Sequence, residues 1–293
     1  MNISLKKGTH FITSLLLLRI MLACSARKPY VYRDDTREYL TKLSRQLDLD
    51  SRDRFPDSVI VFRIWYRHHV VELRKNGDRV QGIYVPFLIR DKDQQLFYKK
   101  FPVPSGQTSR LTDTLIKYKP GHLPESTVSG IDAGSGYFEI RQNGQYRIRR
   151  FGFRNTDEEN NVMNLARLAR MVFRSLPVDS LDRLFIRSLP PGSYSKDMFS
   201  VHVDRFCRDN TQHSTLYREV ERILKNEFGL SDNSGPTRFP LIFLNDREVF
   251  LCDLNRYERD KVKKIYWFTP DDPSATALYG MRAQHGVIII RMK

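Results

Sequence analysis

The stretch that decides the fold class is residues 58–89, SVIVFRIWYRHHVVELRKNGDRVQGIYVPFLI. Nearly half of its residues are β-branched or aromatic, and such side chains favour strands. Asn76-Gly77 accepts the positive φ values that a two-residue hairpin turn requires. We therefore predict an extended segment from Ser58 to Asn76 and a returning strand over 80–89. The pattern indicates an antiparallel sheet.

Further strand patterns follow along the chain. Residues 96–103 and 111–118 predict two more strands, separated by polar turns. A second hairpin over 136–141 and 145–153 turns at Asn143-Gly144. The sheet is therefore expected to be mainly antiparallel.

One strongly amphipathic helix is predicted over 157–175. Its apolar stripe consists of Val162, Leu165, Leu168, Ala169 and Val172. This stripe is expected to cover one face of the sheet. Residues 55–176 are thus predicted to form one α+β domain.

The chain is divided into five predicted segments. They are a signal peptide (1–23), a lipid-anchored tether with a helix over 34–49 (24–54), the α+β domain (55–176), a helical connector (177–235) and a C-terminal module (236–293). The connector contains a helix over 216–228 that ends at Gly229.

Composition limits the function classes. The chain has 293 residues, 40% of them hydrophobic, which excludes a disordered chain, and its net charge of +15 favours polyanionic or anionic-lipid partners. Three cysteines are too few for a disulfide scaffold, and none is spaced as in a zinc site. We expect neither a metal nor a cofactor.

The amino terminus has the pattern of an export signal. Lys6 and Lys7 precede an apolar run over 11–18, which is too short to cross a bilayer. Residues 20–25, IMLACS, resemble the lipobox of bacterial lipoproteins, with Cys24 as the lipidated residue. The resemblance implies an anchor in the outer membrane, with the chain on its periplasmic face. A plain cleaved signal is the alternative.

Cys207 and Cys252 remain once Cys24 is assigned to lipid. An oxidising compartment permits a disulfide between them if their Cα atoms lie within about 7 Å. Two separate buried thiols are the alternative, because a free cysteine behaves as a small hydrophobe.

The C-terminal module carries the most specific pattern. Strands are predicted over 241–244, 247–250, 262–268 and 286–291. A single helical turn is predicted over 274–280, where small residues allow close packing on a sheet and Gly280 accepts a left-handed backbone.

The module resembles the plug domain of TonB-dependent outer-membrane receptors of the Bacteroidetes starch-utilisation type. The matching residues are Asn245, Asp246, Val262, Ile265, Ser274, Ala275, Thr276, Ala277, Leu278, Tyr279, Gly280, Gly286, Val287, Ile288 and Ile290. The resemblance covers roughly the last fifty residues. It implies a small α/β fold in a cell-envelope protein.

A receptor barrel of about 22 strands with roughly ten residues each would need more than about 200 further residues. Because the sequence ends at Lys293, we expect the chain not to be a transporter by itself. We expect a noncatalytic lipoprotein that docks on an envelope protein, such as a TonB-dependent receptor. Alternatively, the module serves only as a stable fold, and the protein binds an anionic glycan or lipid through its basic sheet.

Three other signals are given little weight. Arg150-Phe151-Gly152-Phe153 resembles an RNA-recognition strand, but the required element order is missing, so we expect no nucleic-acid partner. His68, His69 and Glu72 suggest a metal site, yet neighbouring strand residues point to opposite faces. No Gly-x-Ser-x-Gly elbow or cysteine–histidine motif indicates a nucleophile, and we expect no enzyme.

Overall fold

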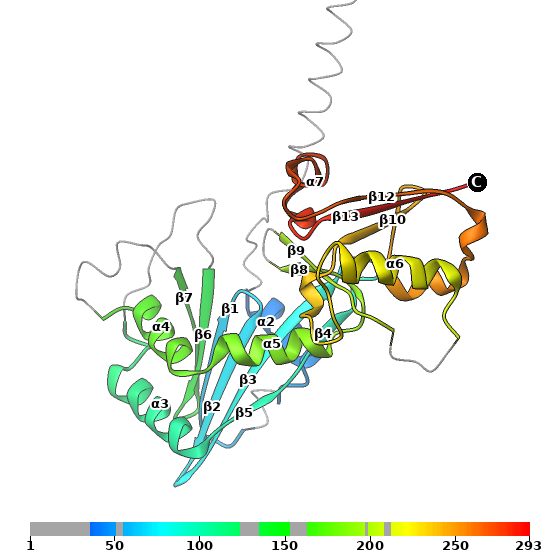
Figure 1. Cartoon of the computed structure of the whole chain (residues 1–293). Coiled ribbons are helices and arrows are strands. Elements are labelled where there is room, and N and C mark those ends of the chain that lie inside the picture. The colour runs from blue at the N-terminus through cyan, green and yellow to red at the C-terminus, as the bar shows by residue number, and fades with distance from the viewer. Residues whose placement is uncertain (1–35, 51–54, 124–134, 153–162, 197–198, 208–211) are drawn as a thin grey trace, which may run out of the picture. The chain divides into compact units, whose positions relative to one another are not determined.

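The structure is a computed structural model, shown in Figure 1. It describes residues 36–50, 55–123, 135–152, 163–196, 199–207 and 212–293. The predicted signal peptide and Cys24 lie outside these ranges. The chain divides after Ser51 into two compact units. The fold is α+β with mainly antiparallel sheets, as predicted.

The first unit contains helix α2 (Thr36–Gln46). Leu40, Leu43 and Leu47 are buried at the three- and four-residue spacing of one helix face. The helix predicted over 34–49 is therefore present over most of its described length.

The second unit contains a nine-stranded sheet with the order β7-β6-β1-β2-β3-β8-β9, and β4 and β5 also pair with β3. Its strands are β1 (Ile60–Tyr66), β2 (His69–Asn76), β3 (Arg79–Arg90), β4 (Leu96–Tyr98), β5 (Phe101–Val103), β6 (Ser135–Gln142), β7 (Gln145–Gly152), β8 (Gly192–Lys196) and β9 (Phe199–Val203). All of the pairs within it are antiparallel.

The two predicted hairpins are present, although the first turns at Gly77-Asp78, one residue later than predicted, because Asn76 still pairs with Arg79. Gly77 has φ +56°, and Asn143 and Gly144 have φ values of +53° and +70°. The extended segment predicted through His68 is wrong, because the chain reverses there and Tyr66 pairs with His69. Arg67 takes a positive φ of 53° at that turn, a conformation that its sequence does not signal.

Helices α3 (Ser105–Tyr118), α4 (Leu165–Ser175) and α5 (Val178–Ser188) cover one face of this sheet (Figure 1). The strand predicted over 111–118 is wrong, because these residues lie in α3. Leu111 and Leu115 recur at helical spacing and join the sheet core. The apolar stripe of α4 is buried as predicted, while Val162 lies outside the described residues.

The predicted connector contributes more than helices. It holds α5 and α6 (Thr215–Asn226), but β8 and β9 also lie in it and extend the large sheet. The polar sequence of β8, GSYSK, lacks the apolar alternation that predicts a strand.

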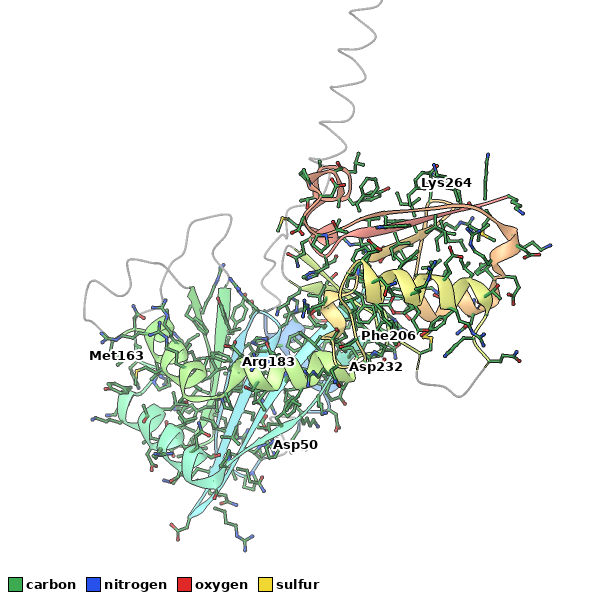
Figure 2. All side chains as sticks on the ribbon, in the orientation of Figure 1. Asp50, Met163, Arg183, Phe206, Asp232 and Lys264 are labelled. Atoms are coloured by element: carbon green, nitrogen blue, oxygen red, sulfur yellow. A yellow bond between two sulfur atoms is a disulfide. The ribbon has the colours of Figure 1, made fainter. Side chains whose placement is uncertain are left out.

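The C-terminal module forms its own four-stranded sheet, ordered β11-β10-β13-β12. Its strands are β10 (Leu241–Leu244), β11 (Arg247–Val249), β12 (Val262–Phe268) and β13 (Val287–Met292). Only β10 and β13 pair in parallel in this sheet. Figure 2 shows the side chains, with Lys264 on β12 and Phe206 near α6.

Two hydrophobic clusters flank this sheet. Ile288 and Ile290 pack with Val220 and Leu224 of α6 on one side. Val287 packs with Ala275 and Ala283 on the other side. Helix α6 therefore belongs to the core of the module, although the sequence placed it in the connector.

Candidate functional site

The residues singled out between Asn245 and Ile290 lie in the C-terminal sheet, in its turns or in the helix that packs against it. Asn245 and Asp246 form the turn between β10 and β11, with φ values of +46° and +65°. The Asn245 side chain accepts a hydrogen bond from the Met292 amide at 2.9 Å. The turn is thereby fastened to the end of β13.

Strand β13 lies in the middle of the module. Val287, Ile288 and Ile290 are fully buried, and Ile265 of β12 pairs with Ile290. Gly286 precedes β13 with φ +89°, and a Cβ at this position would lie 2.4 Å from the Phe268 carbonyl oxygen. Only glycine fits there, because both the backbone conformation and the space exclude a side chain.

Residues 274–280 form most of helix α7 (Pro273–Tyr279) and the glycine that ends it. Ala275 is buried against the sheet, the Tyr279 ring stacks on Phe243 at 5.0 Å, and Gly280 has φ +70°. The expected helix is present, and Gly280 has the expected positive φ, but its ψ of −167° is not that of the left-handed helical conformation. Leu278, in contrast, is 68% exposed.

Asp272 begins α7. Its Oδ1 accepts a hydrogen bond from the Ser274 amide at 2.8 Å, and Pro273 occupies the first helical position. This cap was not predicted from the sequence, although Asp-Pro before a helix is its ordinary signature.

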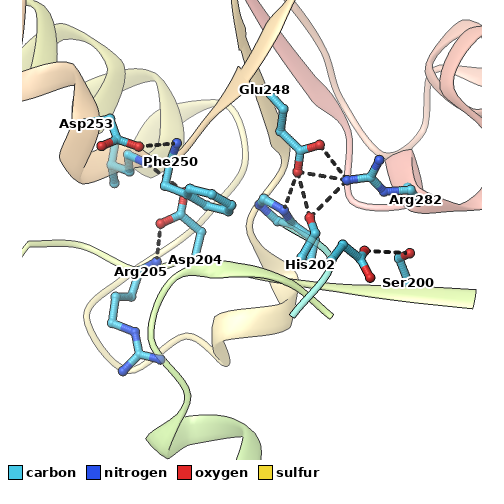
Figure 3. A network of polar contacts seen from close by, with 11 residues as sticks. Ser200, His202, Asp204, Arg205, Glu248, Phe250, Asp253 and Arg282 are labelled. Atoms are coloured by element: carbon cyan, nitrogen blue, oxygen red, sulfur yellow. Dashed lines mark hydrogen bonds and ion pairs between the residues drawn. The ribbon is translucent and has the colours of Figure 1, made fainter. Parts of the chain in front are cut away.

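Glu248 of β11 is the centre of the polar network in Figure 3. Its Oε1 accepts a hydrogen bond from Ser193 Oγ of β8 at 2.7 Å. Arg282 Nη2 donates to both carboxylate oxygens, at 2.8 and 2.6 Å. His202 Nδ1 of β9 lies 3.4 Å from Oε1. The network thus ties the C-terminal module to β8 and β9.

The charge state of Glu248 follows from these contacts. Burial alone would raise the pKa of its carboxyl group. The contacts from His202, Ser193 and Arg282 outweigh burial and hold the pKa at about 2. Glu248 is therefore ionised at neutral pH, and its interactions are charge-assisted.

Asp204 follows β9 and is fully buried. Its carboxylate accepts hydrogen bonds from the amides of Arg205 and Leu251, both at 2.8 Å. Burial raises the pKa of Asp204 to about 6, although the nearby His202 and the two amides act in the opposite direction. This carboxylate connects the end of the large sheet with the segment that follows β11.

Cys207 and Cys252 form a disulfide, with their Cα atoms 5.7 Å apart. Of the two alternatives, the structure therefore has the disulfide rather than two separate thiols. It joins the chain after β9 to the 3-10 helix η4 (Leu251–Arg256), close to the amide that Asp204 binds.

The suggested His68, His69 and Glu72 constellation does not assemble. His68 packs edge-on against Phe87, and His69 Nε2 lies 3.2 Å from Asp182 Oδ2. Glu72 is buried and binds Arg63 and Arg74. Within the described ranges, no three metal-ligating side chains cluster.

Two further observations concern the membrane and RNA interpretations. No helix in the described part of the chain is long and apolar enough to span a membrane. Phe151 is fully buried in the core and cannot stack on a base from the surface, and Phe153 lies outside the described residues.

The comparisons with known proteins give no relative: no protein-family model, curated protein or solved structure matches the chain.

The Glu248 network was not predicted from the sequence. Its members are scattered between residues 193 and 282 and form no local motif.

Proposed function

We propose that this protein is a noncatalytic cell-envelope lipoprotein that docks on an envelope protein through its C-terminal module. Lipidation at Cys24 would hold it at the periplasmic face of the outer membrane. The resemblance to receptor plug domains and to a lipobox supports this proposal. The Cys207–Cys252 disulfide also supports it, because such bonds persist in oxidising compartments.

Exposed apolar side chains gathered on the module carry the docking proposal. Tyr266 of β12 is 41% exposed, and Leu278 and Met281 are 68% and 61% exposed. Tyr266 pairs with Ile289, which packs on the α7 side of the sheet, so Tyr266 lies on the same side as Leu278. We call these three residues, Tyr266, Leu278 and Met281, the docking surface. Trp267, also 41% exposed, pairs with Ile288 and points to the opposite face of the sheet. Large exposed apolar residues elsewhere in the described ranges are scattered over separate elements. A gathered set indicates an interaction site more strongly than scattered single residues do.

Strand β12 gives this surface a hydrogen-bonding edge. Among the described strands it pairs only with β13, whereas β11 at the other edge is fastened by Glu248. An extended segment of the partner can therefore add to the outer side of β12. Lys263 and Lys264 are exposed on this strand and favour a partner segment that carries acidic side chains.

The alternative, recognition of an anionic glycan or lipid by the basic sheet, has less support. Arg149 donates to the carbonyl oxygens of Gly121 and Leu123, both at 2.9 Å. Arg141 donates to the Phe55 carbonyl and lies 3.1 Å from Asp57. Both guanidinium groups serve contacts within the chain, so docking is the better-supported function.

Site-specific photo-crosslinking in cells tests the proposal. A photoreactive residue at Leu278 should form one defined adduct with an envelope protein, and an additional Tyr266→Ser substitution should weaken it. Leu184 on α5 is 50% exposed and is the matched control position. Absence of an adduct at Leu278, or the same adducts at both positions, would contradict docking through this surface.

Lipid attachment is tested separately by labelling cells with palmitate. The wild-type chain should take up the label and the Cys24→Ala variant should not. Uptake by both would refute lipidation at Cys24.

A further inference from the structure

A second site lies far from the docking surface in sequence, where the end of the β1–β2 hairpin meets α4 and α5. An open pocket of about 770 Å³ lies there, between Tyr66 and His69 of the hairpin and the segment that joins the two helices. Its volume is within the range of about 300 to 1,000 Å³ that is typical of small-molecule sites.

The charges around this pocket are mostly positive. Arg170 and Arg174 are four residues apart on α4 and so lie on one helix face. Arg183, labelled on α5 in Figure 2, is the third arginine of the lining. Asp179 contributes one negative charge to the same lining. The carboxylate of Asp182 lies behind His69, so three guanidinium groups stand against two carboxylates, and this excess of positive charge favours an anion in the pocket.

A partly buried contact fixes one wall. His69 Nε2 lies 3.2 Å from Asp182 Oδ2, and the buried Tyr84 hydroxyl donates to Asp182 Oδ1 at 2.6 Å. Burial would raise the pKa of Asp182, but the contacts with His69 and Tyr84 outweigh it and leave the pKa below its ordinary value. The imidazole is therefore held in one orientation by an ionised carboxylate.

The other wall is aromatic. The rings of Tyr66 and Phe173 lie 5.9 Å apart at an angle of 54°, and the His69 ring lies 6.4 Å from Phe173. A ligand that meets the arginines with its anionic end can place an apolar or aromatic body against these rings.

We infer that this pocket binds a phosphate ester, with the phosphate at Arg174 and Arg183 and the rest of the ligand against Tyr66 and Phe173. Guanidinium forks match the oxygens of a phosphate, and three of them suit a group with nearly two negative charges better than a single carboxylate. A lipid headgroup and a soluble phosphorylated compound share this chemistry. The site uses none of the residues of the docking surface.

Binding measurements on the full chain test this inference. Phenyl phosphate, titrated calorimetrically, is the soluble probe. Phosphatidylcholine vesicles with and without phosphatidic acid, in a flotation assay, are the lipid probe. Arg174→Gln and Arg183→Gln change exposed side chains that line the pocket, whereas Arg187→Gln changes an exposed arginine on α5 outside it. Unchanged thermal unfolding of each variant shows that it is folded.

We expect at least one probe to bind and each pocket variant to weaken that binding about tenfold, because a charge-assisted contact is lost, while Arg187→Gln leaves it unchanged. Binding of phenyl phosphate alone identifies a soluble ester as the ligand class. Vesicle binding that requires phosphatidic acid, and that phenyl phosphate displaces, identifies a lipid headgroup. Failure of both probes to bind, or an equal loss in Arg187→Gln, would overturn the inference whether or not the docking surface finds a partner.

Discussion

At the scale of single residues, the partly buried Glu248 and the fully buried Asp204 are carboxylates with opposite pH behaviour. Glu248 has a pKa lowered from 4.5 to about 2, so its ionised form is favoured in the folded state. Asp204 has a pKa raised from 3.8 to about 6, so its protonated form is favoured. Neither pKa shift could be predicted from the sequence, because the contact partners of both carboxylates come from distant segments of the chain.

Glu248→Gln should lower the free energy of unfolding by about 2 to 3 kcal/mol at neutral pH. The reason is that a neutral glutamine cannot make the charge-assisted contacts of the ionised glutamate. The lowered pKa means that this stability is present above about pH 4.5 and is lost as the pH falls toward 2. Urea denaturation at several pH values measures it. Glu221→Gln, which removes an exposed pair with Lys225 on α6, is the control and should cost less than about 0.5 kcal/mol. Equal effects of the two variants would contradict the role given to Glu248.

Asp204→Asn should change the pH dependence in the opposite sense. The raised pKa means that the wild-type protein loses about 2 to 3 kcal/mol of stability from this group as the pH rises from about 4 to about 7. The variant has no carboxyl group at position 204 to ionise, so its free energy of unfolding should fall less over the same pH interval. Parallel pH profiles of the two proteins would show that Asp204 has an ordinary pKa in the folded state.

At the scale of elements, local signals predicted the hairpins at Asn76-Gly77 and Asn143-Gly144, because their turn residues accept positive φ. Local signals did not predict the turn at Arg67-His68, because an arginine takes the positive φ there. They also predicted a strand over 111–118, because the threonines of this helical segment are β-branched and favour strands. Strand β8 was missed because its place in the sheet comes from pairing with β3 and β9 rather than from its composition.

Gly286→Ala should destabilise the protein by more than about 2 kcal/mol, because φ is +89° and the new Cβ would meet the Phe268 carbonyl. Gly106→Ala is the matched control. Its Cβ would have nothing within 4 Å, and alanine favours the first turn of α3, so we expect no loss. Thermal unfolding of both variants is the measurement. A tolerated Gly286→Ala would show that β13 does not begin as described.

At the scale of the molecule, the strands of the C-terminal sheet and the helix between the last two were predicted from the sequence, because apolar runs separated by turn residues mark them. The sequence placed α6 outside the module, since an amphipathic stripe shows that a helix is buried but not which sheet it covers. The arginine-lined pocket could not be predicted either. Its residues come from the β1–β2 hairpin and from α4 and α5, which only the tertiary fold brings together.

The docking proposal depends most on the docking surface of the C-terminal module being a binding site. Leu278→Ser combined with Met281→Ser removes apolar contact area there without touching the buried residues of the sheet. The direct measurement is the dissociation constant between the purified chain and the partner identified by crosslinking. We predict that the double variant binds about tenfold or more weakly, and that Leu184→Ser binds as the wild type does. Equal dissociation constants for all three proteins would contradict the account.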